Sequence, residues 1–204
     1  AVGVGALTNK WAIGALSRLE RFSYARASAI TVLSEDLRES LATRVSDAAK
    51  VRVIPNFVDT ERISPGDRNN NYRTENGLGG ETVVMYAGNV GYSQPLELVV
   101  EAARRLRSRG DIGFVINGEG SRRAELERDA ADLPNMTIVD FQARERLPEV
   151  LAAGDIHLVL LHQGLAAVSV PSKMYSILAA GRPVVASVDL GTEVDRVLTR
   201  SGGG

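Results

Sequence analysis

Short continuous runs of apolar residues alternate with longer segments in which apolar residues recur every three or four positions. The runs predict buried parallel strands at residues 82–87, 112–116, 136–139, 156–161 and 183–187. The segments between and after them predict helices at about residues 96–108, 122–131, 147–153 and 172–180, and a last helix that begins near Thr192. This alternation is typical of the α/β class, so we expect a Rossmann-like parallel sheet with flanking helices.

Residues 1–57 show a shorter form of the same pattern. A helix at about residues 9–27 precedes a strand at 29–33, a helix from Ser34 to about Val45 and a strand at 51–54. Ser34 is a good N-cap, and Glu35 and Asp36 carry the negative charge that the first turn of a helix favours. Two strands are too few for a complete Rossmann-like domain, so we interpret this part as the remnant of one.

Residues 59–80 differ in composition from the segments on both sides. They contain Ser-Pro-Gly-Asp, three consecutive asparagines and Glu-Asn-Gly-Leu-Gly-Gly, all of which interrupt regular structure. A segment of this length is more typical of a domain boundary than of a turn. We therefore expect a mobile, poorly packed linker.

The segment 170–187 predicts a helix that leads directly into a buried strand. Ser172 suits the N-cap, and Gly181 is placed to end the helix in a left-handed turn. Val184 begins an apolar run without alternation, as expected of a parallel strand covered on both faces. Helix starts and strand ends share one edge of such a sheet, so Ser172, Lys173 and free backbone amides predict an anion site there. Phosphate is the expected anion.

Composition excludes several classes of function. The formal net charge is −1, from 24 basic and 25 acidic residues, which gives no reason to expect nucleic acid as a partner. The absence of cysteine excludes disulfides, a thiolate zinc site and a cysteine nucleophile. No metal-ligand spacing is present, and no apolar run approaches the ~20 residues that span a bilayer. The lack of cysteine is compatible with a cytoplasmic protein, which is what we expect. We also expect that both ends are cut, because the chain lacks an initiator methionine and ends in Ser-Gly-Gly-Gly.

Two further loops at the predicted ligand edge contain glycine. The loop after the first strand of the larger sheet holds Gly88 and Gly91, where glycine either admits a ligand close to the backbone or closes a tight turn. The loop after the second strand holds Gly118 and Gly120, but Arg123 occupies the third glycine position of the dinucleotide fingerprint. A nicotinamide or flavin cofactor is therefore not expected.

Charged residues in the remaining loops are weaker candidates. Arg144 and Arg146 are most often solvated charges at the start of a helix. His162 has no acid partner nearby in the sequence, which makes it weak support for acid–base catalysis. His157 lies within an apolar strand, so we predict that it packs in the core.

Six segments resemble the retaining GT-B glycosyltransferases, and specifically the "group 1" family of bacterial exopolysaccharide, capsule and lipopolysaccharide enzymes. These segments are residues 30–35, 53–59, 86–91, 117–120, 147–155 and 171–187, and they occur in the order of the family. The resemblance implies two Rossmann-like domains in a complete enzyme. Residues 1–57 would be the tail of the acceptor domain, 58–80 the inter-domain linker, and 81–204 the nucleotide-sugar-binding domain without its C-terminal end.

The same resemblance implies the activity. The enzyme would transfer a sugar from a nucleotide-sugar, expected to be a UDP-sugar, to a lipid-linked or polysaccharide acceptor bound by the missing domain. No metal or other cofactor is implied. The isolated fragment is expected to be inactive in transfer, and peripheral association of the complete protein with the inner face of the membrane is expected.

The resemblance also assigns site residues. Those expected at the sugar and diphosphate are Lys173, Ser172, Gly88, Asn89, Gly91, Gly191, Thr192 and Glu193. Those expected at the nucleotide are Gly118, Glu119, Gly120, Gln142, Arg144 and Ser176. The catalytic residues are assigned to the missing domain.

The chain departs from the family pattern at two places. Asn89 and Gln94 are neutral where many members have an arginine and a lysine for the diphosphate, so Lys173 would supply the positive charge. Val168 and Ser176 stand where many members have two glutamates, so a ribose-binding carboxylate is missing unless Glu193 replaces it. Two alternatives stay open: a UDP-sugar 2-epimerase, which the resemblance allows because it shares the GT-B fold and a nucleotide site, and a noncatalytic nucleotide-sugar-binding module, which the departures at Val168 and Ser176 keep open.

Overall fold

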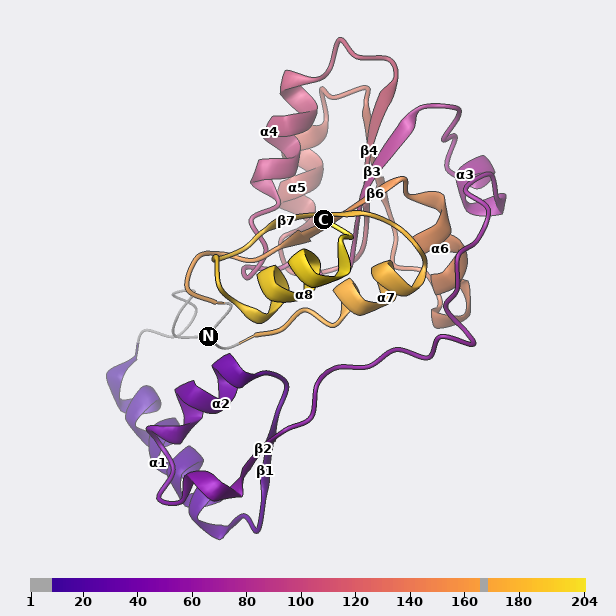
Figure 1. Cartoon of the computed structure of the whole chain (residues 1–204). Coiled ribbons are helices and arrows are strands. Elements are labelled where there is room, and N and C mark those ends of the chain that lie inside the picture. Colours follow the sequence, from indigo (N-terminus) through magenta and orange to yellow (C-terminus); the bar gives the residue numbers. More distant parts are fainter. Residues whose placement is uncertain (1–8, 166–168) are drawn as a thin grey trace.

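The computed structural model describes residues 9–165 and 169–204, and within them it contains two parallel sheets (Figure 1). The larger sheet has five strands in the order β5-β4-β3-β6-β7, and the smaller has two. The strands are β1 (Ile30–Val32), β2 (Val51–Val53), β3 (Thr82–Ala87), β4 (Ile112–Asn117), β5 (Met136–Val139), β6 (Ile156–Leu160) and β7 (Val184–Ser187). The α/β class and the Rossmann-like sheet are confirmed.

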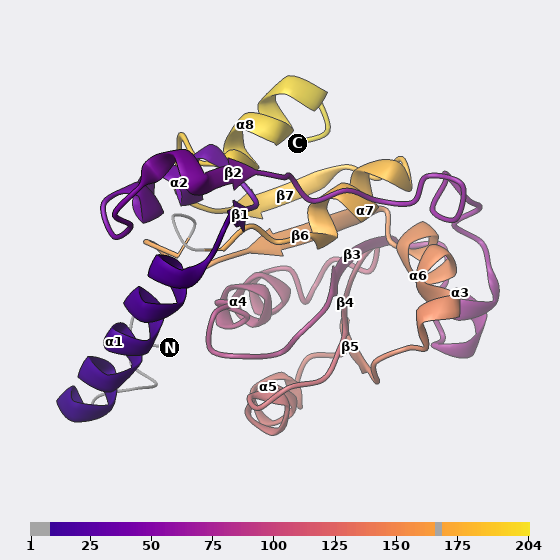
Figure 2. The same cartoon turned by 90° about the horizontal axis from the view of Figure 1, so that it is seen from below.

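Helices cover both faces of the larger sheet (Figures 1 and 2). They are α3 (Asn71–Glu75), α4 (Glu97–Arg105), α5 (Arg123–Ala130), α6 (Leu147–Ala153), α7 (Lys173–Ala179) and α8 (Glu193–Ser201), with a 3-10 turn at Arg144–Arg146. Side chains alternate along β4, so Phe114 and Ile116 pack toward α4 and α5, whereas Val115 packs toward α3 and α6. The core therefore has two layers, one on each face of the sheet.

The predicted helix ends are partly confirmed. The N–H of Leu37 donates to Ser34 Oγ at 3.3 Å, but the helix that Ser34 caps, α2 (Glu35–Ala42), ends before Val45. Gly181 adopts the left-handed conformation with φ 68°, as predicted. The capping role predicted for Ser172 is wrong, because its backbone is already helical and its side chain accepts no cap hydrogen bond.

The prediction that the last strand is covered on both faces is also wrong. β7 lies at the edge of the sheet, and Val185 is 56% exposed. Val184 packs toward α7 and α8. Of the described helices, α4 and α5 lie on the opposite face, and their cluster reaches β6 but contains no residue of β7.

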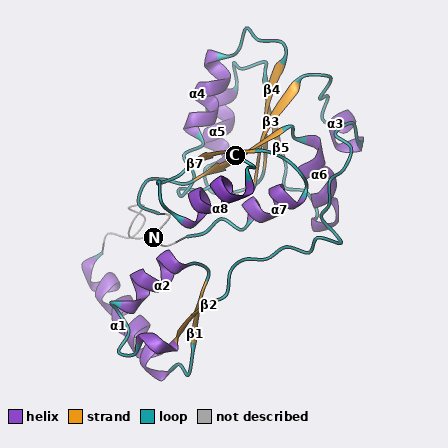
Figure 3. Cartoon of the chain, in the orientation of Figure 1, coloured by secondary structure: helices purple, strands orange, loops and turns teal. Residues whose placement is uncertain are grey.

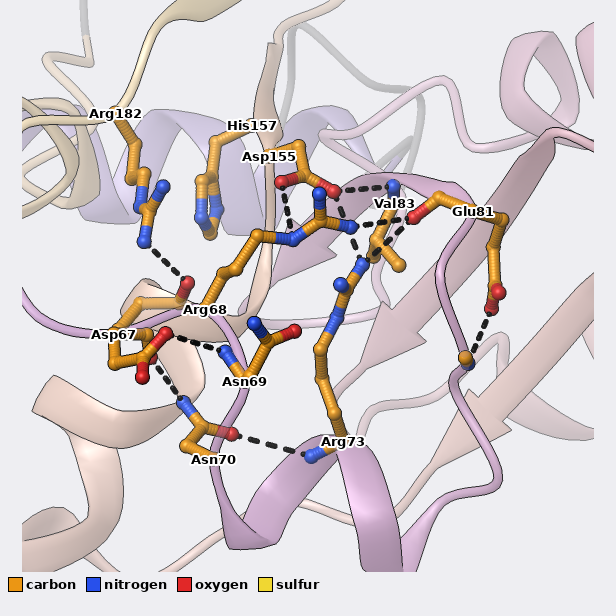
Figure 4. Close-up of polar contacts among 12 residues, drawn as sticks. Asp67, Arg68, Asn69, Asn70, Arg73, Glu81, Val83, Asp155, His157 and Arg182 are labelled. Atoms are coloured by element: carbon orange, nitrogen blue, oxygen red, sulfur yellow. Dashed lines mark hydrogen bonds and ion pairs between the residues drawn. The ribbon is translucent and has the colours of Figure 1, made fainter.

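The prediction of a poorly packed linker at 59–80 is wrong, since Ile63 packs in a core cluster with Met174 and most of the other contacts come from the second half. Tyr72 in α3 is fully buried, and Arg73 is 2% exposed. Asp155 forms ion pairs of 3.0 Å with both Arg68 and Arg73, and it accepts the Val83 N–H at 2.8 Å (Figure 4). Both guanidinium groups also donate to the backbone oxygen of Glu81. We call Arg68, Arg73 and Asp155 the arginine clamp. It holds residues 68–73 against the larger sheet and its helices, which together we call the larger unit.

The smaller unit consists of α1 (Lys10–Arg26), α2, a 3-10 turn at Ala48–Lys50 and the pair β1–β2 (Figure 3). α1 has no buried residue, and Trp11 on it is 90% exposed. The two units meet where Asp36 of α2 accepts the backbone N–H of Glu193 at 2.8 Å and pairs with Arg196 at 2.9 Å. No helix among residues 9–165 and 169–204 is long and apolar enough to cross a membrane.

Candidate functional site

The carboxyl ends of the central strands open onto a cleft of about 650 Å³ between the strand ends, α6 and α7. Its walls are formed by Tyr86, Ala87, Gly88, Asn89, Gln94, Asn117, Phe141, Gln142, Ala143, Arg144, Leu147, Val150, Leu151, Leu160, Leu161, Ser169, Pro171, Ser172, Lys173, Ser176 and Ile177. This is the edge at which parallel α/β sheets bind ligands. The volume suits a molecule the size of a nucleotide.

Lys173, in the first turn of α7, is one of the cleft residues, and its ammonium nitrogen is buried at the cleft wall between the Tyr86 ring and Gly88. Its Nζ lies 3.7 Å from the centroid of the Tyr86 ring, and no described residue accepts a hydrogen bond from it. Burial lowers the pKa of Lys173 to about 7. A buried ammonium without an anionic partner is costly, and a bound anion would compensate for that cost.

Gly88 provides the space that the ammonium group occupies. A Cβ atom at this position would lie 2.5 Å from Lys173 Nζ, and the backbone has φ 148°, which side chains rarely adopt. The buried Tyr86 hydroxyl below it donates to the Asn89 backbone oxygen at 2.7 Å and so fixes the loop. The glycine predicted from the sequence is therefore needed next to Lys173.

Half of the residues predicted from the sequence are brought together in the cleft. They are Lys173, Ser172, Gly88, Asn89, Gln142, Arg144 and Ser176. Val168, the other position where the family often has a glutamate, lies outside the described residues. Arg146, predicted to be solvated, pairs instead with Glu75 at 2.8 Å and Glu149 at 3.0 Å.

Gly118 and Gly120 do not line the cleft; they allow two loops to pack closely. A Cβ on Gly118 would lie 1.9 Å from the Gly88 oxygen, and one on Gly120 would lie 2.1 Å from the Val90 oxygen. The loops are joined by the Val90 N–H, which donates to the Glu119 oxygen at 2.7 Å. Gly91 does not line the cleft either; a Cβ there would meet Asn89 and Gln94 of its own loop, and the Glu119 side chain pairs with Arg123 at 2.9 Å.

We predict that Gly118→Ala disturbs this junction and thereby the loop that carries Gly88. Because the added methyl group meets backbone atoms, we expect a loss of roughly 1–3 kcal/mol in the free energy of unfolding. Chemical denaturation measures this loss. Gly80→Ala, whose Cβ has nothing within 4 Å, is the matched control. Equal effects of the two substitutions would contradict the predicted close approach.

Gly191, Thr192 and Glu193 also lie outside the cleft walls, at the start of α8. The Glu193 carboxylate pairs with Arg196 at 3.1 Å, and its backbone N–H donates to Asp36. The Gly191 N–H donates to Asp195 Oδ2 at 2.7 Å. The backbone N–H groups of Gly191 and Glu193 at the start of α8 thus already donate to side chains of this chain, and the Glu193 carboxylate is paired with Arg196.

Several parts of the site were not predicted from the sequence. Phe141, Leu147 and Leu151 form much of an apolar wall, but their positions relative to the cleft depend on the sheet order. Asn117 lines the cleft, and Tyr72 donates to it from a segment predicted to be a linker. A polar residue at the end of a buried strand was a usable signal for Asn117; no sequence signal pointed to Tyr72.

The histidines are not part of the cleft. His157 is fully buried with Nε2 2.9 Å from the Leu151 oxygen, and burial lowers its pKa to about 4. Its predicted role in the core is confirmed. His162 is not among the cleft residues. Among the described residues there is no group of three or more side chains that could hold a metal ion.

Comparisons with known proteins agree with this picture. A model of the family "Glycosyl transferases group 1" matches residues 81–201, and a model of "Glycosyltransferase Family 4" matches residues 6–62. The putative colanic acid biosynthesis glycosyl transferase WcaI of Escherichia coli (strain K12) is 40% identical over 117 residues, covering 56% of this chain. The probable glycosyltransferase WbjE of Pseudomonas aeruginosa is 27% identical over 191 residues, covering 92% of this chain. The chain spans only 28% and 47% of these two relatives.

Solved structures share the fold. Anabaena HepE in complex with UDP-glucose superposes with a TM-score of 0.69 at 16% identity, over 91% of this chain and 56% of HepE. WaaG, a glycosyltransferase involved in lipopolysaccharide biosynthesis, superposes with a TM-score of 0.67 at 16% identity, over 91% of this chain and 57% of WaaG. At this identity the likeness concerns the fold alone.

Proposed function

Since the chain belongs to the group 1 glycosyl transferases, we propose that its cleft binds the nucleotide-sugar donor, expected to be a UDP-sugar, of a retaining, metal-independent transferase. The observation that carries this proposal is Lys173, a residue of the cleft wall whose buried ammonium group has no hydrogen-bond acceptor among the described residues. A diphosphate supplies the missing negative charge. Residues 1–57, 58–80 and 81–204 are proposed as the acceptor-domain tail, the linker and the donor domain.

The remaining walls of the cleft suit the rest of a nucleotide. Gly88, Asn89 and Ser172 lie near Lys173 in the fold and offer small or neutral polar groups for the diphosphate. Phe141, Leu147 and Leu151 offer apolar surface for a base. As the bond to the sugar breaks, negative charge grows on the leaving diphosphate, and a fixed ammonium group stabilises that charge.

The acceptor and the transfer step involve the rest of the protein in this proposal. The proposed acceptor is a lipid-linked or polysaccharide glycan; WcaI is named for colanic acid biosynthesis and WaaG for lipopolysaccharide biosynthesis. The isolated chain is expected to bind donor and to transfer nothing. A 2-epimerase would require carboxylates and a histidine, and the cleft walls that the structure describes contain neither. A noncatalytic module differs from the transferase only in the turnover of the complete protein.

Isothermal titration of the chain with UDP, uridine, UDP-glucose and GDP tests donor binding. We expect UDP and UDP-glucose to bind more tightly than uridine, because only they carry the diphosphate. Weaker binding of GDP would support UDP as the nucleotide. No binding of any nucleotide or nucleotide-sugar would refute the proposed function.

UDP affinity should fall as pH rises above 7.5. The free Lys173 has a pKa of about 7, and a bound diphosphate raises it, so binding takes up a proton between the two values. Log K then falls by up to about one per pH unit while UDP itself stays fully ionised. Titrations at pH 7.5, 8.5 and 9.5 measure the slope. Lys173→Arg, which is charged throughout, should flatten it, and a flat wild-type profile would contradict the prediction.

A further inference from the structure

Tyr72 and Asn117 form a buried pair directly beneath the cleft. The Tyr72 hydroxyl donates to Asn117 Oδ1 at 2.9 Å. Tyr72 comes from α3, and its ring is fully buried in the cluster of Val83, Met85 and Val115. It precedes residues 81–201, the part of the chain that matches the group 1 family model. A residue of the supposed linker therefore reaches the floor of the candidate site.

Both partners of the pair are held in place by other contacts. The backbone N–H of Tyr72 donates to Glu149 Oε1 on α6 at 3.0 Å. Asn117 is the last residue of β4, and its backbone oxygen accepts the Gly88 N–H at 2.9 Å. Neither residue can move without shifting α3 or the strand ends. The pair is thus rigid at the base of the cleft.

The hydrogen bond determines which end of the Asn117 amide faces the ligand. Tyr72 can donate only to the amide oxygen, so the NH2 group is left over. That group takes part in no hydrogen bond with the described residues, while Asn117 lines the cleft. Burial also raises the pKa of the Tyr72 hydroxyl, which keeps it protonated as a donor. The site therefore presents the fixed N–H donors of the Asn117 amide at the end of β4.

We propose that Tyr72 is a positioning residue that holds the Asn117 amide so that its NH2 group donates to an acceptor atom of the nucleoside part of the donor. The inference rests on the proposed function. The nucleoside is the expected partner because Asn117 pairs with Val139 of β5, two residues before Phe141, and Val139 packs in the same cluster as Val150 of α6. Those elements carry the apolar wall of the cleft. Lys173, by contrast, serves the diphosphate.

Tyr72→Phe tests the pair, because it removes the hydroxyl and keeps the ring. The Asn117 amide is then free to turn, and the affinity for uridine and for UDP should fall by about three- to tenfold. Asn117→Ala should lose at least as much for both ligands. Tyr175→Phe is the matched control, since the buried Tyr175 hydroxyl has no partner among the described residues and lies outside the cleft.

The double variant separates positioning from a purely structural role. If Tyr72 acts through Asn117, Tyr72→Phe should change uridine affinity by less than twofold in the Asn117→Ala background. An equal loss in both backgrounds would overturn the inference. The inference would also be overturned if Tyr72→Phe lowered the unfolding midpoint but bound uridine and UDP with wild-type affinity. A loss of affinity for UDP alone would overturn it as well. In each of these cases, binding of UDP by the wild-type protein would still support the proposed function. If the wild-type protein bound no UDP, the proposed function and the role of Tyr72 would both be refuted.

Discussion

Replacing Lys173 by alanine should weaken UDP binding by about ten- to hundredfold and leave uridine binding nearly unchanged. A charge-assisted hydrogen bond contributes ~1.5–3 kcal/mol, and Asn89 and Gln94 in the neighbouring loop are neutral. Arg144 is the other cation in the cleft walls, and it lies after β5 rather than at α7. Calorimetric titration with UDP and uridine measures both affinities. Parallel losses for the two ligands would contradict a role at the diphosphate.

Two further variants sharpen this experiment. Lys10→Ala removes an exposed lysine at the start of α1 and should change neither affinity. Lys173→Met removes the charge, keeps an unbranched side chain that is one atom shorter, and should raise the unfolding midpoint of the ligand-free protein. The pKa of Lys173 is about 7 in the folded protein, below the value of a lysine in an unfolded chain. Burial of the charged lysine therefore destabilises the fold fully below pH 7, and this destabilisation disappears as pH rises toward 10. The gain from methionine should therefore be larger at pH 6 than at pH 9.

Asp155→Ala should lower the free energy of unfolding by about 3–5 kcal/mol, because it leaves the buried Arg73 without its counter-charge. Asp155 also accepts the Val83 N–H, so the first strand of the sheet loses a hydrogen bond at the same time. Burial already lowers the pKa of Arg73, and Asp155 opposes that effect. Urea denaturation followed by circular dichroism measures the loss.

Asp111→Ala is the control for this substitution. Asp111 pairs with Arg109 at 2.7 Å, but both side chains are exposed, so its removal should leave the midpoint nearly unchanged. If Asp155→Ala were as mild as Asp111→Ala, the arginine clamp would not stabilise the fold. A smaller loss in Asp155→Asn would separate the charge from the hydrogen bond to Val83.

The larger sheet was predictable because its strands are continuous apolar runs bounded by glycine, proline or polar residues. The position of Lys173 at the cleft was predictable as well, since the ends of parallel strands and the starts of the following helices share one edge of the sheet. The position of Val185 was not, because its exposure depends on which strand lies at the edge of the sheet. Local sequence does not contain that information.

The arginine clamp and the buried pair show the other limit. Asparagine and glycine around Tyr72 correctly predict interrupted backbone, but order depends on partners far along the chain. Asp155 lies 82 positions after Arg73, and Asn117 lies 45 positions after Tyr72. The predicted role of Glu193 in the site had a similar limit. Glu193 lies outside the cleft walls, and its backbone N–H donates to Asp36, which comes from the smaller unit. Only the folded chain brings these residues together.

The arginine clamp also bears on how donor specificity could be exchanged between relatives. A chimaera joined at Glu81, where the group 1 match begins, would combine one protein's Asp155 and Asn117 with another protein's clamp arginines and Tyr72 position. A junction before Ile63, which packs in the core with Met174, keeps these partners in one parent. The exchangeable part of this chain is therefore longer than the segment that matches the family model, and crossover points are best placed on the stretch that follows β2.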